Sequence, residues 1–477
     1  MLLAADLGTS NVKVCLFGEA GLLAIGRAPL TSAHPAPGRV EQDAGSWWDA
    51  FAAATAAARA AARPADWRQV AALSFSTARE TIVPVDPAGA PLGPAIVWSD
   101  RRAVAEAAEL AARLGGAEAV RRRTGVPIDG ASVAAKLAWL DRHHPDLAGR
   151  CRWIVGPRDL LVLHLTGEVA TDTTVATRSG LLGRDLAPLD ELAGPWRDRL
   201  PPVLAPATVA GHLRDAPAAL LGLPAGLPVV VGAGDRACEA LGAGASTGVP
   251  AVSWGTAASC SMPVADRPDP PPPGMAVTAA ADGGWLVEAG QSGAGAALGW
   301  LGRLSGRTTE ALVGLAADSP PGARGVLALP WFDGARSPWW RSDVGGAFAG
   351  LDSAQGLGDL VRAVVEAVAL DVARALQLVG PTTELVACGG GASSAWVEIL
   401  AAATAMPVRR RASGESGSVG AAALAAAVAG LAFDLERVNP TVDRQLPDPR
   451  LVACYAALRP VADRLAAAIL ELHAPTA

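Results

Sequence analysis

The stretch Pro228–Gly242, PVVVGAGDRACEALG, constrains the fold of this chain most strongly. Its β-branched run Val229–Val231 predicts a buried strand, and the small residues after Asp235 predict a helix. The glycines between them leave room for a ligand at the carboxyl end of the strand, where open α/β sheets bind their ligands. Asp235 is therefore either a carboxylate that takes a proton from a bound hydroxyl or the N-cap of the following helix. This stretch alone leaves both roles open.

The amino-terminal residues predict a strand, a tight turn and a second strand. The turn, Gly8-Thr9-Ser10, offers backbone N–H groups and hydroxyls to an anion such as phosphate. Asp6, at the end of the first strand, supplies carboxylate oxygens of the kind that Mg²⁺ prefers. Lys13, on the second strand, adds a positive charge. An ordinary hairpin with polar turn residues is the alternative.

The same order of strand, Gly-Thr turn and strand returns in Ala251–Met262, AVSWGTAASCSM. Gly255 and Thr256 thus stand where Gly8 and Thr9 stand in the first half. This repetition suggests a duplicated architecture.

Three consecutive glycines, Gly389–Gly391, follow a predicted strand at Glu384–Ala387 and precede a predicted helix at Ala395–Ala405. Glycines at such a position bring backbone amides close to a phosphate or a nucleotide. The pattern is not G-x-G-x-x-G, and no acidic residue follows at the spacing of dinucleotide sites. Dinucleotide binding is therefore not expected.

Charged side chains also follow two other predicted strands, Val70–Phe75 and Ala95–Trp98. We expect Arg79, Glu80, Trp98 and Asp100 to lie near one another at these strand ends. Arginine and carboxylate groups supply directional donors and acceptors, which suits a polyhydroxylated ligand. A surface ion pair is the alternative. The helical and irregular region at 103–206 is not expected to carry the chemistry alone.

The length of 477 residues predicts at least two large domains, and 51% apolar with 18% charged residues is typical of globular chains. A net charge of −6, with only two arginine triplets, disfavours a nucleic-acid partner. The longest apolar run, Val419–Phe433, is too short to span a bilayer, so no membrane partner is expected. A signal peptide is not expected either, because the amino end lacks a basic region. Six scattered cysteines without a C-x-x-C pair predict free thiols in a reducing cytoplasm.

In their order along the chain, these motifs resemble those of the FGGY carbohydrate kinase family, which has the actin-like, ribonuclease-H-like fold. The matches are Asp6-Leu-Gly-Thr-Ser10 and Trp254-Gly255-Thr256 for two phosphate loops, Gly390-Gly391-Ala392 for the adenosine loop, Gly232-Ala-Gly-Asp235 for the base motif, Gly346–Leu351 with Asp359-Leu360 and Ala363–Glu366 for the carboxyl-terminal signature, and Lys136-Leu-Ala-Trp139-Leu140 for the core of the other signature. The positions just upstream of that core, Ala131 and Val133, do not match.

The resemblance implies an α/β fold with two ribonuclease-H-like (actin-like ATPase) domains, at 1–245 and 246–477, and a cleft between them. It implies a kinase that uses ATP and Mg²⁺ to phosphorylate a primary hydroxyl of a small sugar or polyol. A cytoplasmic location and a homodimer are further expectations. The implied roles are catalysis by Asp235; acceptor binding by Arg79, Glu80, Trp98, Asp235 and Arg236; nucleotide binding by Gly8, Thr9, Ser10, Lys13, Gly255, Thr256, Gly295, Gly390, Gly391 and Ala392; and metal binding by Asp6 and Asp235.

The acceptor itself is less constrained by the resemblance. The pair Arg79-Glu80 is similar to that of glycerol kinases, whereas xylulokinases usually have Met-His there. Glycerol kinases also have a tyrosine near Ala131 and a glutamine at the position of Arg236. The missing ring suggests a longer acceptor, so a pentulose such as xylulose is predicted, with glycerol or another polyol as the alternative. An actin-like or chaperone-type ATPase, or a sugar-sensing regulator, gives no reason for Asp235 beside the Arg-Glu pair.

Overall fold

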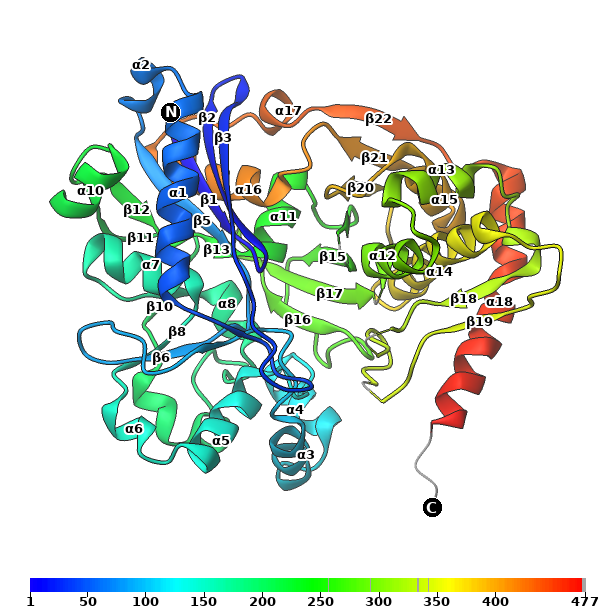
Figure 1. Cartoon of the computed structure of the whole chain (residues 1–477), viewed down its shortest axis with the longest axis horizontal. Helices are drawn as coiled ribbons and strands as arrows, with labels where there is room; N and C mark the ends of the chain where they lie inside the picture. Colours follow the sequence, from blue (N-terminus) through cyan, green and yellow to red (C-terminus); the bar gives the residue numbers. More distant parts are fainter. Residues whose placement is uncertain (256, 292, 333, 342, 474–477) are drawn as a thin grey trace.

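The computed structural model describes residues 1–255, 257–291, 293–332, 334–341 and 343–473. Each half of the chain contains one large mixed sheet, and the two halves lie side by side with helices between and around the sheets (Figure 1). Among the described residues, no helix is long and apolar enough to cross a membrane.

The sheet of the first half has the strand order β11-β12-β5-β1-β2-β3, with β13 beside β5. The first three strands along the chain form an antiparallel meander, and β5 then pairs with β1 in parallel. The strands are β1 (Leu2–Leu7), β2 (Asn11–Gly18), β3 (Gly21–Pro29), β5 (Ala72–Thr77), β11 (Val209–His212), β12 (Pro228–Val230) and β13 (Ala233–Gly234).

The sheet of the second half has the order β16-β17-β15-β14-β20-β21-β22. Its strands are β14 (Ala251–Trp254), β15 (Ala258–Val264), β16 (Ala276–Ala279), β17 (Trp285–Gln291), β20 (Leu385–Cys388), β21 (Val408–Arg411) and β22 (Thr441–Gln445). The path β17-β15-β14-β20-β21 repeats the path β3-β2-β1-β5-β12, with three antiparallel strands followed by two strands in parallel pairing. The predicted α/β class and duplicated architecture are confirmed. The edge strands β16 and β22 were not predicted.

Helices cover both sheets (Figure 1). Those of the first half are α1 (Gly45–Ala61), α2 (Pro64–Trp67), α3 (Val104–Arg113), α4 (Ala117–Thr124), α5 (Val133–His143), α6 (Leu147–Arg150), α7 (Pro157–Thr166), α8 (Thr173–Arg178), α9 (Asp190–Ala193), α10 (Asp215–Leu221) and α11 (Asp235–Ala243). Those of the second half are α12 (Ala294–Ser305), α13 (Thr309–Ala317), α14 (Leu357–Gln377), α15 (Ser394–Thr404), α16 (Ser416–Ala429), α17 (Leu435–Val438) and α18 (Pro449–Leu472).

Short strand pairs complete the loops between these elements. They are β4 (Glu41–Gln42) with β7 (Ala95–Ile96), β6 (Val83–Val85) with β8 (Trp153–Val155), β9 (Thr171–Asp172) with β10 (Val203–Leu204), and β18 (Leu327–Leu329) with β19 (Ala347–Ala349).

Helices α11 and α16, one from each half, pack against each other between the two sheets (Figure 1). They come this close because glycines lie at the crossing. A β-carbon on Gly242 would stand 2.0 Å from the carbonyl oxygen of Ser416, and one on Gly420 would stand 2.0 Å from that of Cys238. Both contacts are far below van der Waals distance, so larger residues would force the helices apart. The small-residue composition of these helices therefore joins the two halves.

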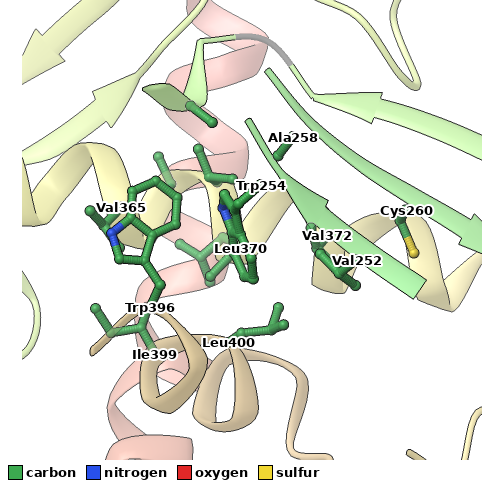
Figure 2. Close-up of a cluster of buried hydrophobic side chains, with 14 of the residues drawn as sticks. Val252, Trp254, Ala258, Cys260, Val365, Leu370, Val372, Trp396, Ile399 and Leu400 are labelled. Carbon is green, nitrogen blue, oxygen red and sulfur yellow. The ribbon is translucent and has the colours of Figure 1, made fainter. Parts of the chain in front are cut away.

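The core of the second half supports the ends of β14 and β20. The rings of Trp254 on β14 and Trp396 on α15 meet edge to face, with centroids 5.2 Å apart (Figure 2). Helix α14 packs beneath them and is buried along most of its length. This rigid core fixes the positions of the glycine-containing turns that follow Trp254 and Cys388.

Candidate active site

Strand register brings the predicted strand-end residues together. Asp6 on β1 lies opposite Ser76 on β5, and Gly234 on β13 lies opposite Thr77. Because these strands are parallel, the segments that follow them leave the same edge of the sheet. Arg79 and Asp235 consequently meet, with Arg79 Nε 3.1 Å from Asp235 Oδ1.

This edge forms one wall of a cavity of about 230 Å³ between the two halves, which we call the interdomain pocket. All the residues predicted to bind an acceptor line it: Arg79, Glu80, Trp98, Asp235 and Arg236. The second half supplies Ala257, Ala335, Arg336, Trp340 and Arg341.

Two glycines before Asp235 make this arrangement possible. Gly232 has a φ of +73°, and a β-carbon there would stand 2.0 Å from the carbonyl oxygen of Phe75. A β-carbon on Gly234 would stand 2.5 Å from Cδ of Arg79. The sequence Gly-Ala-Gly therefore allows the turn and opens the space through which the Arg79 side chain reaches Asp235.

Asp235 is the first residue of α11, and the N-cap position belongs to Gly234. Its Oδ1 accepts the backbone N–H of Arg236 at 2.8 Å, and its side chain is 46% exposed in the interdomain pocket. A half-exposed carboxylate in a polyol-sized cavity is within reach of a bound hydroxyl. This geometry favours the proton-accepting role over a purely capping one.

Arg79 also spans the two halves. Its two terminal nitrogens each donate to a carboxylate oxygen of Glu288 on β17, both at 2.7 Å. Burial opposes the charges of this pair, yet Glu288 raises the pKa of Arg79 and Arg79 lowers the pKa of Glu288. Both groups therefore stay ionised, and Arg79 presents a fixed positive charge to Asp235.

Glu80 has a left-handed backbone, with a φ of +64°, which is uncommon for a residue with a side chain and is typical of functional sites. The fully buried ammonium of Lys136 donates to the carbonyl oxygen of Glu80 at 2.7 Å and to that of Val97 at 3.0 Å. Burial lowers the pKa of Lys136 to about 8. The Glu80 carboxylate pairs with Arg178 Nε at 3.0 Å. The signature residue Lys136 thus holds two segments of the pocket wall.

Trp98 connects the interdomain pocket to the first glycine turn. Its indole Nε1 donates to Thr9 Oγ1 at 2.7 Å. Asp100, in contrast, was expected near Arg79 and Glu80 at the ligand site, yet it does not line the interdomain pocket. Asp100 is fully buried and pairs with Arg102 at 2.7 Å. Two backbone N–H groups also donate to its oxygens, so its hydrogen bonds are satisfied away from the pocket.

The first glycine turn is closed by a hydrogen bond from the Gly8 amide to the carbonyl oxygen of Asn11 at 3.1 Å, and Ser10 in this turn is exposed. Lys13 Nζ lies 2.7 Å from Glu415 and 3.5 Å from Asp6. The predicted phosphate ligand Lys13 is therefore held by carboxylates from both halves.

The predicted nucleotide-binding residues of the second half gather around the end of β14. The Gly295 amide donates to the carbonyl oxygen of Gly255 at 3.1 Å, and the Gly391 amide donates to that of Trp254 at 3.0 Å. Gly390 is exposed, and Ala392 closes the turn through a bond to Gly389 at 3.2 Å. Thr256 lies outside the described residues.

Carboxylates near this edge of the sheet lie close to one another, which favours binding of a cation. Burial raises the pKa of Asp6, and the nearby Asp235 raises it further. Burial and then Asp235 raise the pKa of Glu239, one turn along α11, to about 7. Among the described residues, no three His, Cys, Asp or Glu side chains converge on one metal position. One or two carboxylates completed by nucleotide phosphates are the usual Mg²⁺ arrangement, so Asp6 and Asp235 fit that ion.

Several lining residues were not predicted. Asp129 and Arg178 come from the region 103–206, and Arg178 is the last residue of α8. Arg336 and Trp340 come from the loop after β18, which has no periodic pattern. Trp340 supplies an aromatic ring to the pocket, whereas Ala131 leaves its own side small.

Comparison with known proteins identifies the family. The chain matches the N-terminal domain of the FGGY family of carbohydrate kinases over residues 1–242 and the C-terminal domain over 251–429. It is 33% identical over 440 residues to a xylulose kinase of Streptomyces coelicolor, covering 89% of this chain and 87% of the relative. It is 35% identical over 416 residues to a glycerol kinase of Leptothrix cholodnii, covering 82% and 80%. The crystal structure of a xylulose kinase from Rhodospirillum rubrum superimposes with a TM-score of 0.87 at 30% identity, covering 99% of each chain. This protein belongs to the FGGY family of ATP-dependent carbohydrate kinases.

Proposed function

We propose that this kinase transfers the γ-phosphoryl group of ATP to a primary hydroxyl of a pentulose such as xylulose. The observation that carries the proposal is the half-exposed carboxylate of Asp235 in the interdomain pocket, beside the fixed charge of Arg79. The similarity to xylulose kinases supports a five-carbon acceptor. The small side chain of Ala131 leaves space for carbons that glycerol lacks.

In the transfer, the acceptor oxygen forms a bond to the γ-phosphorus while the bond from that phosphorus to the β–γ bridging oxygen breaks and ADP leaves. The hydroxyl proton passes to the carboxylate of Asp235. Arg79, anchored by Glu288, holds its guanidinium 3.1 Å from that carboxylate and so orients it in the pocket. Glu80, Trp98 and Arg236 bind and orient the acceptor hydroxyls.

We place ATP against the glycine-containing turns of both halves, because exposed backbone amides and hydroxyls there suit phosphates. The proposed contacts are Gly8, Thr9, Ser10, Lys13, Gly255, Thr256, Gly295, Gly390, Gly391 and Ala392. Asp6 and Asp235 would hold Mg²⁺, with Glu239 nearby. When bound, Mg²⁺ neutralises charge on the transferring phosphoryl group.

We also propose domain boundaries at 1–245 and 246–477, in the segment between α11 and β14. A cytoplasmic location is supported by the free state of the described cysteines, which is typical of reducing compartments. The homodimer stays a prediction, which light scattering would test.

The test is a coupled assay of ADP release with xylulose, ribulose, xylitol and glycerol as acceptors. We expect the highest kcat/KM for a pentulose. The highest kcat/KM for glycerol would favour the alternative of a glycerol kinase. This alternative is supported by the Arg79-Glu80 pair and by the similarity to the glycerol kinase of Leptothrix cholodnii. ADP release that is independent of every acceptor would contradict the sugar-transfer function.

A further inference from the structure

The loop that follows β18 brings Arg336 to the interdomain pocket. The Ser337 amide donates to the carbonyl oxygen of Gly290 on β17 at 3.0 Å, which attaches this loop to the sheet of the second half. A β-carbon on Gly290 would stand 3.3 Å from Cδ of Arg336, so the glycine leaves room for the stem of the arginine. Asp235 lines the same pocket from the first half. Arg336 and the proposed proton acceptor therefore share one cavity.

The guanidinium of Arg336 lies near the turns at which we place the phosphates of ATP. It lies over the ring of Trp98, 5.4 Å from the centroid, and the indole Nε1 of Trp98 donates to Thr9 Oγ1 at 2.7 Å. Ala257, whose carbonyl oxygen accepts the Gly255 amide at 3.0 Å in the second glycine turn, also lines the pocket. The pocket thus borders both glycine turns, and a single ring separates Arg336 from the first.

Arg336 has no carboxylate partner. No described residue forms an ion pair or a hydrogen bond with its side chain. Burial and then the neighbouring Arg236, Arg101 and Arg178 lower the pKa of Arg336 to about 10, so it stays protonated at neutral pH. Four other arginines of the pocket are paired, namely Arg79 with Glu288, Arg178 with Glu80, Arg101 with Asp129 and Arg341 with Asp343.

The proposed reaction brings a matching anion to this cation. A pentulose is uncharged, so its hydroxyls alone would leave the guanidinium without a counter-ion. The γ-phosphoryl group has to pass from ATP at the glycine turns to a hydroxyl beside Asp235, and the pocket borders both. Its negative charge is spread over three equatorial oxygens, and a planar guanidinium can donate to two of them at once. The carboxylate of Asp235 repels the same oxygens, and a nearby cation offsets this repulsion.

We propose that Arg336 is a further catalytic residue, which donates hydrogen bonds to two oxygens of the phosphoryl group during its transfer. The proposal rests on the kinase function proposed above. In the transfer, the acceptor oxygen bonds to the γ-phosphorus, the bond to the β–γ bridging oxygen breaks, and Asp235 takes the hydroxyl proton. Arg336 keeps its own protons throughout. It therefore contributes to the rate of transfer rather than to the binding of ATP or of the acceptor.

The experiment measures the single-turnover rate of transfer to the acceptor that the wild-type kinase uses best in the panel above. For Arg336→Gln we expect this rate to fall roughly 10²- to 10³-fold, as for the loss of one donor to a developing charge. The Kd values of ATP and of the acceptor should change little. Arg336→Lys, which keeps the charge but not the planar fork, should recover part of the rate. Arg307→Gln removes the same charge at an exposed site in the same half and should leave the rate unchanged.

A second measurement detects the contact without turnover. Aluminium fluoride, bound with ADP and Mg²⁺, mimics the planar phosphoryl group. The wild-type kinase should therefore bind ADP more tightly in calorimetry when aluminium fluoride and the acceptor are added. We expect this gain in affinity to be lost in Arg336→Gln and kept in Arg307→Gln, while the affinity for ADP alone stays the same in both.

Transfer at the wild-type rate by Arg336→Gln overturns the inference. So does a slower transfer in which the gain in ADP affinity survives, or weaker binding of the acceptor at an unchanged rate, which would make Arg336 an acceptor ligand. If Arg336→Gln does not fold, Arg336→Lys decides: a rate below that of the wild type supports the inference, and an equal rate overturns it.

The kinase function is tested separately in the same experiment. A wild-type kinase that phosphorylates no acceptor of the panel contradicts that function, and the aluminium fluoride measurement then decides on Arg336. A gain in ADP affinity that is lost in Arg336→Gln supports the contact, and an equal or absent gain overturns it.

Discussion

The two proposed ligand sites of this kinase present different chemical groups to their ligands. Around the end of β14, the turns at which we place ATP present glycine backbone, as at Gly255 and the exposed Gly390. The interdomain pocket presents charged side chains that bind one another, such as Arg79 with Glu288. A polyphosphate can be held by backbone amides that any sequence provides. Distinguishing one acceptor from another requires side chains in fixed positions, and this pocket draws them from both halves.

This difference predicts how substitutions would impair ligand binding at each site. In the interdomain pocket, substitutions should act through charge and unsatisfied hydrogen bonds, because each group is held by another. At the turns where ATP is placed, substitutions should act sterically, because any side chain added to a glycine would occupy space that the nucleotide needs. A substitution at either site should also weaken the binding of that site's ligand and leave the binding of the other ligand unchanged.

Asp235→Asn tests the acceptor side most severely. Asparagine preserves the size of the side chain and can accept the backbone N–H of Arg236, but it cannot take a proton. We expect kcat to fall roughly 10²- to 10⁴-fold, with KM for ATP changed much less. The measurement is the coupled assay, with thermal unfolding to show that the variant is folded. Near-normal turnover would show that Asp235 only supports the start of α11.

Sequence reasoning predicted the parts of both sites that follow strands directly. Asp6, Arg79 and Asp235 come after buried apolar runs, so parallel pairing alone brings them to one edge. The partners that cross between halves could not be predicted this way. Glu288 is a lone carboxylate within the apolar strand WLVEAGQ, and its burial makes sense only once Arg79 faces it. Arg336 lies in a loop without periodicity, where only the folded chain gives its position.

Glu288→Gln tests whether the two halves are held together by charge. The glutamine keeps the shape but leaves the buried guanidinium of Arg79 with less compensation. Breaking a buried pair in this way costs about 3 kcal/mol or more, so we expect a clear drop in Tm. Glu109→Gln is the control, because the Glu109–Arg142 pair is exposed and such pairs contribute little to stability. Equal effects of the two substitutions would contradict the structural role of Glu288.

Lys136→Met tests whether the wall of the interdomain pocket depends on one buried ammonium. The substitution removes the donor to the carbonyl oxygens of Glu80 and Val97, so the strained backbone of Glu80 loses its support. We expect KM for the acceptor to rise roughly tenfold, as for a net loss of one to two kcal/mol of hydrogen bonding. KM for ATP should change little. An equal rise in both constants would mean that Lys136 acts on the whole cleft.

The lowered pKa of Lys136 also predicts that the free energy of unfolding depends on pH. Its pKa is about 8 in the folded state, below the ordinary value of 10.5. Between these values the unfolded chain binds more protons than the folded one, so this residue makes the free energy of unfolding rise with pH across that window. We expect a contribution on the order of 1 to 3 kcal/mol. Chemical denaturation at pH 7.5 and 10 measures it, and the wild-type increase should be larger than that of Lys136→Met.

Gly390→Val tests the nucleotide side and should have the smallest effect. Among the described residues, no atom lies within 4 Å of where its β-carbon would be, so the chain can fold around a valine. At Gly391, by contrast, a β-carbon would stand 3.3 Å from Trp254, which would mix packing with binding. A branched side chain at 390 occupies space beside the turns where ATP is placed. We therefore expect the Kd of ATP to rise roughly tenfold, or about 1.4 kcal/mol, while acceptor binding is unchanged. Gly149→Val, at another open and exposed glycine, is the matched control and should leave both affinities intact. Calorimetry with each ligand separates the outcomes: if Gly390→Val weakened the acceptor instead, the division between a backbone-built nucleotide site and a side-chain-built acceptor site would be wrong.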